Sequence, residues 1–203
     1  MKLRRIIVAS GNEHKIEEIK KILKGLPVEV VSKNEVGLED FEVIEDGDTL
    51  EENAIKKAIE ISQKIEGVVL ADDTGLFVEK LGGEPGIYSA RYAGENVTYL
   101  DNNKKLLKNL KGIKLEDRQA EFRTVIAIVL ENKKIKTLTG ICKGKIALEP
   151  KGDKGFGYDP LFIVDGYDRT FSQLGEEIKN EISHRVKALR KLRNSLEEIL
   201  KDE

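Results

Sequence analysis

The stretch VVLADDTGLFVEKLGGEPGIYSARYAG, residues 68–94, decides the fold class of this chain. It begins with a short β-branched apolar run, then sets Asp72 and Asp73 side by side before a glycine- and proline-rich continuation. A short apolar run bounded by polar and turn-forming residues predicts a buried strand of an α/β sheet. Ligands of such sheets bind at the carboxyl ends of the strands. The stretch therefore predicts a central strand that ends on two acids at a binding site.

The segments on either side predict alternating strands and helices. Expected strands lie at residues 5–10, 28–31 and 68–71, in two runs within 120–148 joined by a turn at 131–134, and after a glycine-rich loop that begins at 152. Expected helices follow residue 15, follow a capping box made by Thr49 and Glu52, cover 98–112, and begin near Ser183. This order predicts an α/β fold with a mixed sheet, in which βα units come first and antiparallel strands later.

Length and composition limit the class of protein. The 203 residues suit one domain, residues 1–203, with no linker that would divide it. The formal net charge of -2 provides no global basic field, so nucleic acid is disfavoured as a partner. Cys142 is the only cysteine, which excludes an intrachain disulfide and indicates the cytoplasm. The apolar run near the N-terminus is too short for a membrane span or a signal segment.

The loop SGNEHK, residues 10–15, joins the first expected strand to the first expected helix. A helix N-terminus offers free backbone N–H groups and a partial positive charge, and Lys15 adds a full charge in the first helical turn. The loop therefore predicts a phosphate-binding site, although it lacks the second glycine and the Lys-Ser/Thr pair of a Walker motif. An ordinary strand–helix loop with a solvated lysine is the alternative.

Asp72 and Asp73 point to opposite faces if their backbone is extended, so we expect different roles for them. One would bind Mg²⁺ directly, because hard divalent cations that pair with phosphates prefer carboxylate oxygens. The other would bind the ion through water or activate a nucleophile. A turn in which one aspartate bonds to the backbone is the alternative. In the preceding acidic loop Glu39 is the best candidate ligand, and most of the other acids are expected to be surface charges: Glu35, Asp40, Glu42, Glu45, Asp46 and Asp48.

Two further segments contain candidate binding residues. KGFGYDP, residues 154–160, places Phe156 and Tyr158 beside glycines, where an aromatic ring suits stacking on a flat heterocycle or, alternatively, packing in the core. SHR, residues 183–185, opens the helix that begins near Ser183 and would offer an imidazole and a guanidinium, or simply a cap with surface charges. The sequence contains no His/Cys cluster that indicates zinc, and its cysteine has no nearby histidine.

Five runs follow one another along nearly the whole chain: SGNEHKIEEI, ENAIKKA, ADDTGLFVEKLGGEPGIYSARYAG, GFGYDPLFI and SHRVKAL. Together they resemble the inosine triphosphate pyrophosphatase family, also called the Ham1-like family. The resemblance implies an elongated mixed β-sheet with flanking helices and two lobes around a central substrate cleft, usually as a homodimer. It also implies hydrolysis of ITP, dITP and XTP to the nucleoside monophosphate and pyrophosphate with Mg²⁺, or Mn²⁺ in its place. Such an enzyme removes deaminated purines from the nucleotide pool.

The resemblance also assigns roles by position. Asp73 would be the general base, and Lys15 would neutralise the leaving pyrophosphate. Lys179, His184 and Arg185 would contact the base or its 6-oxo group. The implied metal ligands are Glu39, Asp72 and Asp73. The residues implied to contact substrate are Ser10, Gly11, Asn12, Glu13, His14, Lys15, Lys57, Thr74, Phe156, Gly157, Tyr158, Asp159, Lys179, His184 and Arg185.

The sequence departs from the commonest pattern of the family at two positions. Thr74 replaces a frequent serine and keeps the hydroxyl, and His14 stands where glycine or lysine is common. Three other functions compete with this interpretation. They are a Maf-like pyrophosphatase of modified pyrimidine nucleotides, a nucleotide sensor without catalysis, and an RNA-binding module, which the acidic balance disfavours.

Overall fold

The structure, a computed structural model, describes residues 4–201 of the chain, apart from the side chains of residue 14 and of residues 199–201. Within this range the chain divides into two compact units. Unit 1 takes residues 4–73, 124–140 and 185–201, and unit 2 takes residues 74–123 and 141–184. The strands follow the order β2-β1-β3-β5-β6-β7, with β4 paired to β3. The predicted mixed α/β sheet with flanking helices is confirmed.

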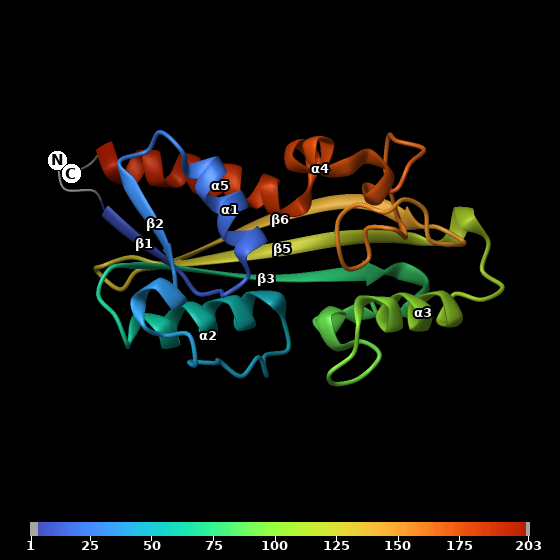
Figure 1. Ribbon diagram of the computed structural model, residues 1–203, viewed down its shortest axis with the longest axis horizontal. Helices are drawn as coiled ribbons and strands as arrows, with labels where there is room; N and C mark the ends of the chain where they lie inside the picture. The colour runs from blue at the N-terminus through green and yellow to red at the C-terminus, as the bar shows by residue number, and fades with distance from the viewer. Residues whose placement is uncertain (1–3, 202–203) are drawn as a thin grey trace. The chain divides into compact units, whose positions relative to one another are not determined.

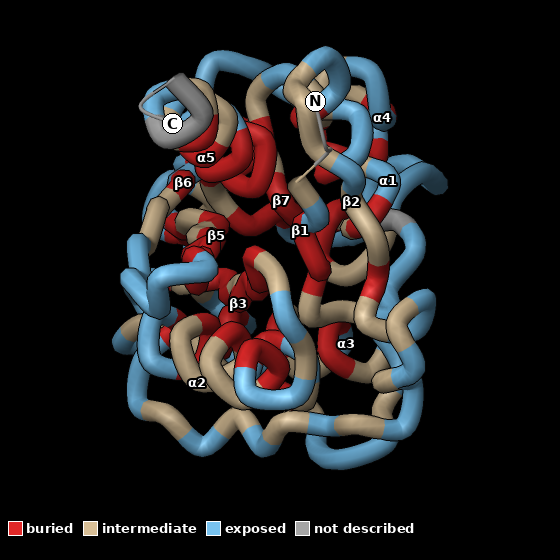
Figure 2. Tube along the Cα trace, turned by 90° about the vertical axis from the view of Figure 1, so that its left-hand side faces the viewer, coloured by how far each residue is buried: buried red, intermediate tan, exposed pale blue. Residues whose placement is uncertain are grey.

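Unit 1 is built on parallel strands between two layers of helix. Strand β1 pairs in parallel with β2 on one side and with β3 on the other. Helices α1 and α5 cover one face of these strands and α2 covers the other (Figure 1). The elements are β1 (Arg4–Val8), α1 (Glu13–Leu23), β2 (Val28–Ser32), α2 (Leu50–Ser62), β3 (Val68–Val78) and α5 (His184–Lys201). The buried core lies between β1, β3 and the inner faces of α1 and α5, which are red in Figure 2.

Unit 2 continues the long strands with antiparallel partners. The second half of β3 pairs with β4, and β6 pairs with β7, both antiparallel. Its aromatic core includes Phe122, Phe162 and Phe171. The elements are β4 (Pro85–Gly86), α3 (Tyr99–Asn109), β5 (Gln119–Val129), β6 (Ile135–Ile146), β7 (Phe162–Val164) and α4 (Phe171–Ile182). Short 3₁₀ turns cover Asn34–Val36, Glu79–Leu81, Ser89–Arg91 and Leu115–Asp117.

The central strand is longer than predicted. We expected it to end at the two acids, but β3 runs on to Val78, so Asp72 and Asp73 lie in the middle of an eleven-residue strand. The strand continues because Leu76 and Val78 enter the core of unit 2 and the backbone pairs with β4. The turn residues act only after this second half, where Gly82 has a φ of 65° that favours glycine.

Helix α4 was not predicted, although a helix-start signal precedes it. Thr170 and Gln173 form a capping box of the type that was predicted correctly at α2. Gly175 inside the helix has a φ of 79° and interrupts its regular geometry, which hides the helical period in the sequence. Within residues 4–201, no helix is both long and apolar enough to cross a membrane.

Candidate active site

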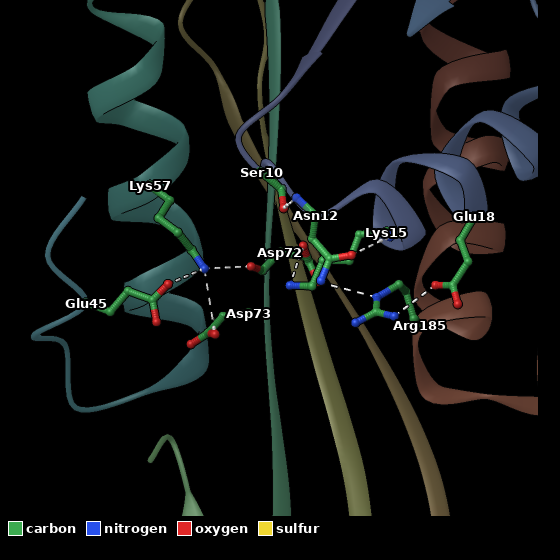
Figure 3. Close-up of polar contacts among 9 residues, drawn as sticks. All are labelled: Ser10, Asn12, Lys15, Glu18, Glu45, Lys57, Asp72, Asp73 and Arg185. Carbon is green, nitrogen blue, oxygen red and sulfur yellow. Dashed lines mark hydrogen bonds and ion pairs between the residues drawn. The ribbon is translucent and has the colours of Figure 1, made fainter. Parts of the chain in front are cut away.

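Asp72 is a buried carboxylate held between two cations (Figure 3). Its oxygens lie 3.0 and 3.1 Å from Lys15 Nζ on α1, and its Oδ2 lies 3.5 Å from Arg185 Nε on α5. Burial alone would raise the pKa of the Asp72 carboxyl, but Lys15, Arg185 and Lys57 outweigh that effect and lower it. Asp72 is therefore an anion that fixes the positions of two basic side chains.

Arg185 extends this row of alternating charges to Glu18. Its Nη1 donates to Glu18 Oε2 at 2.9 Å, and its side chain is only 5% exposed. Burial by itself would lower the pKa of Arg185, yet Asp72 and Glu18 raise it, so the guanidinium stays charged. Glu18 was not among the predicted site residues. Its spacing of three residues from Lys15 puts both on one face of α1, and that spacing could have identified it.

Asp73 belongs to a second cluster, around Lys57 on α2 (Figure 3). Lys57 Nζ lies 2.7 Å from Glu45 Oε1, 3.7 Å from Asp73 Oδ1 and 2.7 Å from the carbonyl oxygen of Asp72. Burial would lower the pKa of Lys57, but Asp73, Asp72 and Glu45 together raise it. The cluster thus gathers two carboxylates about one cation.

The two acids occupy opposite faces of the strand, as predicted. Asp72 meets Lys15 and Arg185 from the helices of one face, whereas Asp73 meets Lys57 from α2 on the other (Figures 1 and 3). Adjacent residues of an extended strand must diverge in this way. Two different electrostatic environments therefore lie one residue apart.

Different surroundings separate the three acids implied as metal ligands, Glu39, Asp72 and Asp73. Glu39 is exposed, and its carbonyl oxygen accepts a hydrogen bond from Lys33 Nζ. In the described part of the chain, no three His, Cys, Asp or Glu side chains gather closely enough to hold a metal, so Glu39, Asp72 and Asp73 do not form a cluster. Glu45 and Asp73 each contact the positive charge of Lys57. Mg²⁺ is usually held by one or two carboxylates plus substrate phosphates, and this pair fits that requirement.

The loop of residues 10–15 has the geometry of a capped helix start. The Asn12 side chain accepts a hydrogen bond from Lys15 N at 3.2 Å, and Ser10 Oγ accepts one from Asn12 N at 3.1 Å. Gly11 and Glu13 are exposed on the same loop. The side chain of His14 lies outside the described residues. The loop leaves an accessible helix N-terminus beside Lys15, which suits an anion.

Unit 2 assembles a separate group of predicted residues. Lys179 Nζ lies 2.5 Å from Asp159 Oδ2 and 4.2 Å from the centre of the Phe156 ring. Asp159 also accepts the Phe156 backbone N–H at 2.9 Å, which fixes the aromatic loop to the lysine. Lys179 and Asp159 are buried, whereas Phe156 is half-buried. A cation and an aromatic ring are thus held together, as cation–π contacts require.

The remaining predicted residues of unit 2 divide between core and cluster. Tyr158 is buried, donates to the carbonyl of Ser89, and has its pKa raised by burial, so it is a core aromatic. The buried His184 ring stacks on Phe122 with a centroid separation of 4.7 Å. Thr74 is half-buried in β3, directly after Asp73. Of the two aromatics that the sequence left open, Tyr158 is therefore packed in the core, whereas Phe156 is half-buried.

The site thus belongs to an α/β protein with charge clusters on opposite faces of a central strand and an exposed helix start beside a lysine. A family model described as the Ham1 family matches residues 6–195. This chain belongs to the Ham1 family.

Relatives and solved structures agree with this assignment. A dITP/XTP pyrophosphatase of Thermoanaerobacter sp. (strain X514) is 54% identical over 190 residues, which are 94% of this chain and 95% of the relative. The dITP/XTP pyrophosphatase of Bacillus subtilis (strain 168) is 45% identical over 195 residues, 96% and 98% of the two chains. The solved Staphylococcus aureus Ham1 protein superimposes with a TM-score of 0.89 at 42% identity, covering 97% of this chain and 100% of its own.

Proposed function

We propose that this protein is a nucleoside triphosphate pyrophosphohydrolase that cleaves ITP, dITP and XTP to the nucleoside monophosphate and pyrophosphate. The observation that carries the proposal is the identity along nearly the whole chain with proteins named dITP/XTP pyrophosphatase. In the reaction, a water oxygen bonds to the α-phosphorus, and the bond from that phosphorus to the bridging oxygen of the β-phosphate breaks. The water proton goes to a base, and pyrophosphate leaves with the bridging oxygen.

Unit 1 supplies the groups for this chemistry. The helix start at residues 10–15 binds phosphate oxygens through its backbone N–H groups, and Lys15 and Lys57 stabilise negative charge there. Asp73 accepts the proton of the attacking water. Asp72 acts differently, because its ion pairs with Lys15 and Arg185 fix the cations of the site.

Glu45 and Asp73 are the pair that would hold Mg²⁺, or Mn²⁺ in its place, together with substrate phosphates. When bound, the ion supplies charge neutralisation for the phosphates. Asp72 remains a second-choice ligand, because its carboxylate already contacts two cations. Glu39 is the weakest choice, because it is exposed on the acidic loop.

Unit 2 supplies the groups for the purine. Phe156 offers a half-exposed ring for stacking, and Gly157 and Asp159 shape its loop. Donors from Lys179 and His184 suit the 6-oxo acceptor that hypoxanthine and xanthine share, whereas adenine presents an amino donor at that position. A mismatch of this kind leaves buried polar groups unpaired, which discriminates strongly. Arg185 is a weaker candidate for this contact, because its guanidinium already binds Glu18 and Asp72 in unit 1.

A panel of nucleoside triphosphates with Mg²⁺ tests the proposal, with pyrophosphate and orthophosphate measured separately. We expect pyrophosphate from ITP, dITP and XTP, much less from ATP and GTP, and loss of activity with a chelator that added Mg²⁺ reverses. Preference for modified uridine triphosphates would instead indicate a Maf-like enzyme. Binding of ITP without release of pyrophosphate would indicate a nucleotide sensor. Either outcome would overturn the proposal.

We also propose that the protein works as a homodimer in the cytoplasm, as one domain. The single cysteine suits a reducing compartment. Light scattering after size-exclusion chromatography measures the molar mass, and we expect twice the 22.8 kDa of one chain. The mass of a single chain at micromolar concentration would contradict the dimer.

A further inference from the structure

Asn103 on α3 has a buried side-chain amide of which only the nitrogen end is hydrogen-bonded within the described chain. Its Nδ2 donates to the carbonyl oxygen of Gly157 at 3.0 Å, and the residue is only 7% exposed. Its Oδ1 is buried and accepts no hydrogen bond from residues 4–201. Buried amide oxygens are rarely left in this state. The orientation is fixed, because a carbonyl can only accept and so must face the Nδ2 donor.

The neighbouring Asn102 shows what a structural asparagine of the same helix looks like. Its Oδ1 accepts from Ala93 N at 2.7 Å, and its Nδ2 donates to the carbonyl of Ala90 at 3.0 Å. Both ends of that amide are satisfied by the fold. Asn103 therefore differs from Asn102, because its amide oxygen has no hydrogen-bond donor within the described residues.

The surroundings of Asn103 belong to the loop that we assign to the nucleoside. Gly157, its partner, follows Phe156 directly in the chain. Tyr99 lies four residues before Asn103 and so on the same face of α3. The Tyr99 ring centre is 6.2 Å from that of Phe156, and Tyr99 itself is 56% exposed. One face of α3 thus places an accessible ring and a buried acceptor along the aromatic loop.

We propose that Asn103 determines specificity in the nucleoside half of the site, with Nδ2 holding the Gly157 carbonyl and Oδ1 accepting a hydrogen bond from the substrate. The donor is an N–H of the purine or a hydroxyl of the ribose, since both present the same chemistry to an amide oxygen. The inference rests on the proposed function, in which the loop around Phe156 binds the nucleoside. A site built to pair with a substrate donor rejects analogues that lack it, because its own polar group is then left unpaired.

The test combines changes in the protein with changes in the substrate. The value of kcat/KM is measured for wild type, Asn103→Leu and Asn103→Asp with ITP, dITP and the N1-methyl derivative of ITP. We expect wild type to lose about tenfold or more with the analogue that lacks the donor. Asn103→Leu should have a lower kcat/KM with ITP than wild type. Its kcat/KM should not fall further with the analogue that lacks the donor, because the acceptor is already absent. Asn103→Asp keeps an acceptor oxygen and should remain sensitive to the missing donor, even though its second oxygen opposes the Gly157 carbonyl.

Matched variants separate this role from a structural one. Asn109→Leu is the control, because it makes the same change on the same helix. Its kcat/KM should fall with each analogue, relative to ITP, by the same factor as that of wild type. Asn103→Ala replaces Asn103→Leu if the leucine variant does not fold. Loss with N1-methyl-ITP assigns the donor to the base, and loss with dITP assigns it to the ribose. If kcat/KM falls with the analogues by the same factor in wild type and in the Asn103 variants, the role of Asn103 is overturned and the proposed function is unaffected. Absence of pyrophosphate from ITP with wild type would instead refute the proposed function.

Discussion

At the scale of single residues, the neighbouring carboxylates of Asp72 and Asp73 have different roles. Asp72 lies among permanent cations and keeps Lys15 and Arg185 in place. Asp73 shares Lys57 with Glu45 on the other face of the strand. The same residue type thus serves positioning at one site and proton transfer, as we propose, at the next.

Replacing each acid by its amide separates these roles. We expect Asp73→Asn to lower kcat by about a hundredfold or more with nucleotide binding retained, because a general base is lost. We expect Asp72→Asn to lower the free energy of unfolding by about 3 kcal/mol, because the buried Arg185 and the half-buried Lys15 lose their counter-charge. Steady-state kinetics, calorimetric nucleotide binding and urea unfolding measure the three quantities. If Asp72→Asn costs more kcat than Asp73→Asn, the roles are reversed.

The pH dependence of stability provides a second test of Asp72. Its folded-state pKa lies below the ordinary value of 3.8, so its charge contributes stability that is present above that value and is lost as the pH falls through the folded pKa. We expect wild-type stability to fall steeply below about pH 5, and Asp72→Asn to fall less steeply over the same range. Urea unfolding at a series of pH values measures both slopes. Parallel curves would show that Asp72 contributes nothing to acid sensitivity.

The predicted part of the site and the missed part differ in how local their signals are. Lys15 lies in the first turn of a helix, and Asp72 and Asp73 directly follow a β-branched apolar run. Both positions can be read from short-range pattern. The sequence does not single out Glu45, because the acidic loop has no period that distinguishes one carboxylate from the others. The pairing of Arg185 with Asp72 depends on the packing of α5 against β3, and no spacing in the sequence encodes it.

At the scale of elements, the same capping motif occurs at an exposed and at a buried helix start. Thr98 and Thr170 both cap helices of unit 2 through a hydroxyl that accepts a backbone N–H. Thr98 is exposed, whereas Thr170 is fully buried and also donates to the carbonyl of Lys151 at 2.7 Å. The buried cap therefore joins helix α4 to the loop before it.

We expect the two caps to differ in their contribution to stability. Thr98→Ala should lower the free energy of unfolding by about 1 kcal/mol, the usual value for a cap. Thr170→Ala should lower it by about 2 kcal/mol, because the Lys151 carbonyl also loses its donor. Thr170→Ser keeps the hydroxyl and serves as the control. Equal losses at both positions in thermal or urea unfolding would show that burial adds nothing to the cap.

The elements were predicted well where pattern and packing agree. The capping box of α2 and the parallel start of the sheet were both visible in local sequence. The length of β3 was not visible there. The glycine- and proline-rich continuation after the two acids favours an end of the strand, but the pairing of Leu76 and Phe77 with β4 keeps it extended. Tertiary pairing overrides local turn preference at this point.

At the scale of the whole molecule, strands β3, β5 and β6 each contribute residues to both units. Unfolding of such a strand in one unit would also break its hydrogen bonds in the other unit. We therefore expect one cooperative unfolding transition, consistent with the proposed single domain.

The distribution of tyrosine makes this expectation testable. The chain has no tryptophan, and all five tyrosines belong to unit 2: Tyr88, Tyr92, Tyr99, Tyr158 and Tyr167. Tyrosine fluorescence therefore reports on unit 2 alone, whereas far-ultraviolet circular dichroism reports on both units. We expect the two urea transitions to coincide. A tyrosine transition with its own midpoint would show that the units unfold separately.

The division of the chain into units also fixes the order in which they are completed during synthesis. All residues of unit 2 have been translated by residue 184, whereas Arg185 and the core residues Ala188, Leu189 and Leu192 of unit 1 come later. Until then the nascent chain exposes the face of β1 that α5 will cover, and Asp72 lacks one of its two cations. Translation of unit 1 therefore starts before that of unit 2 and is completed after it. A chain that ends at residue 184 would contain the whole of unit 2 but would leave an apolar face of unit 1 uncovered.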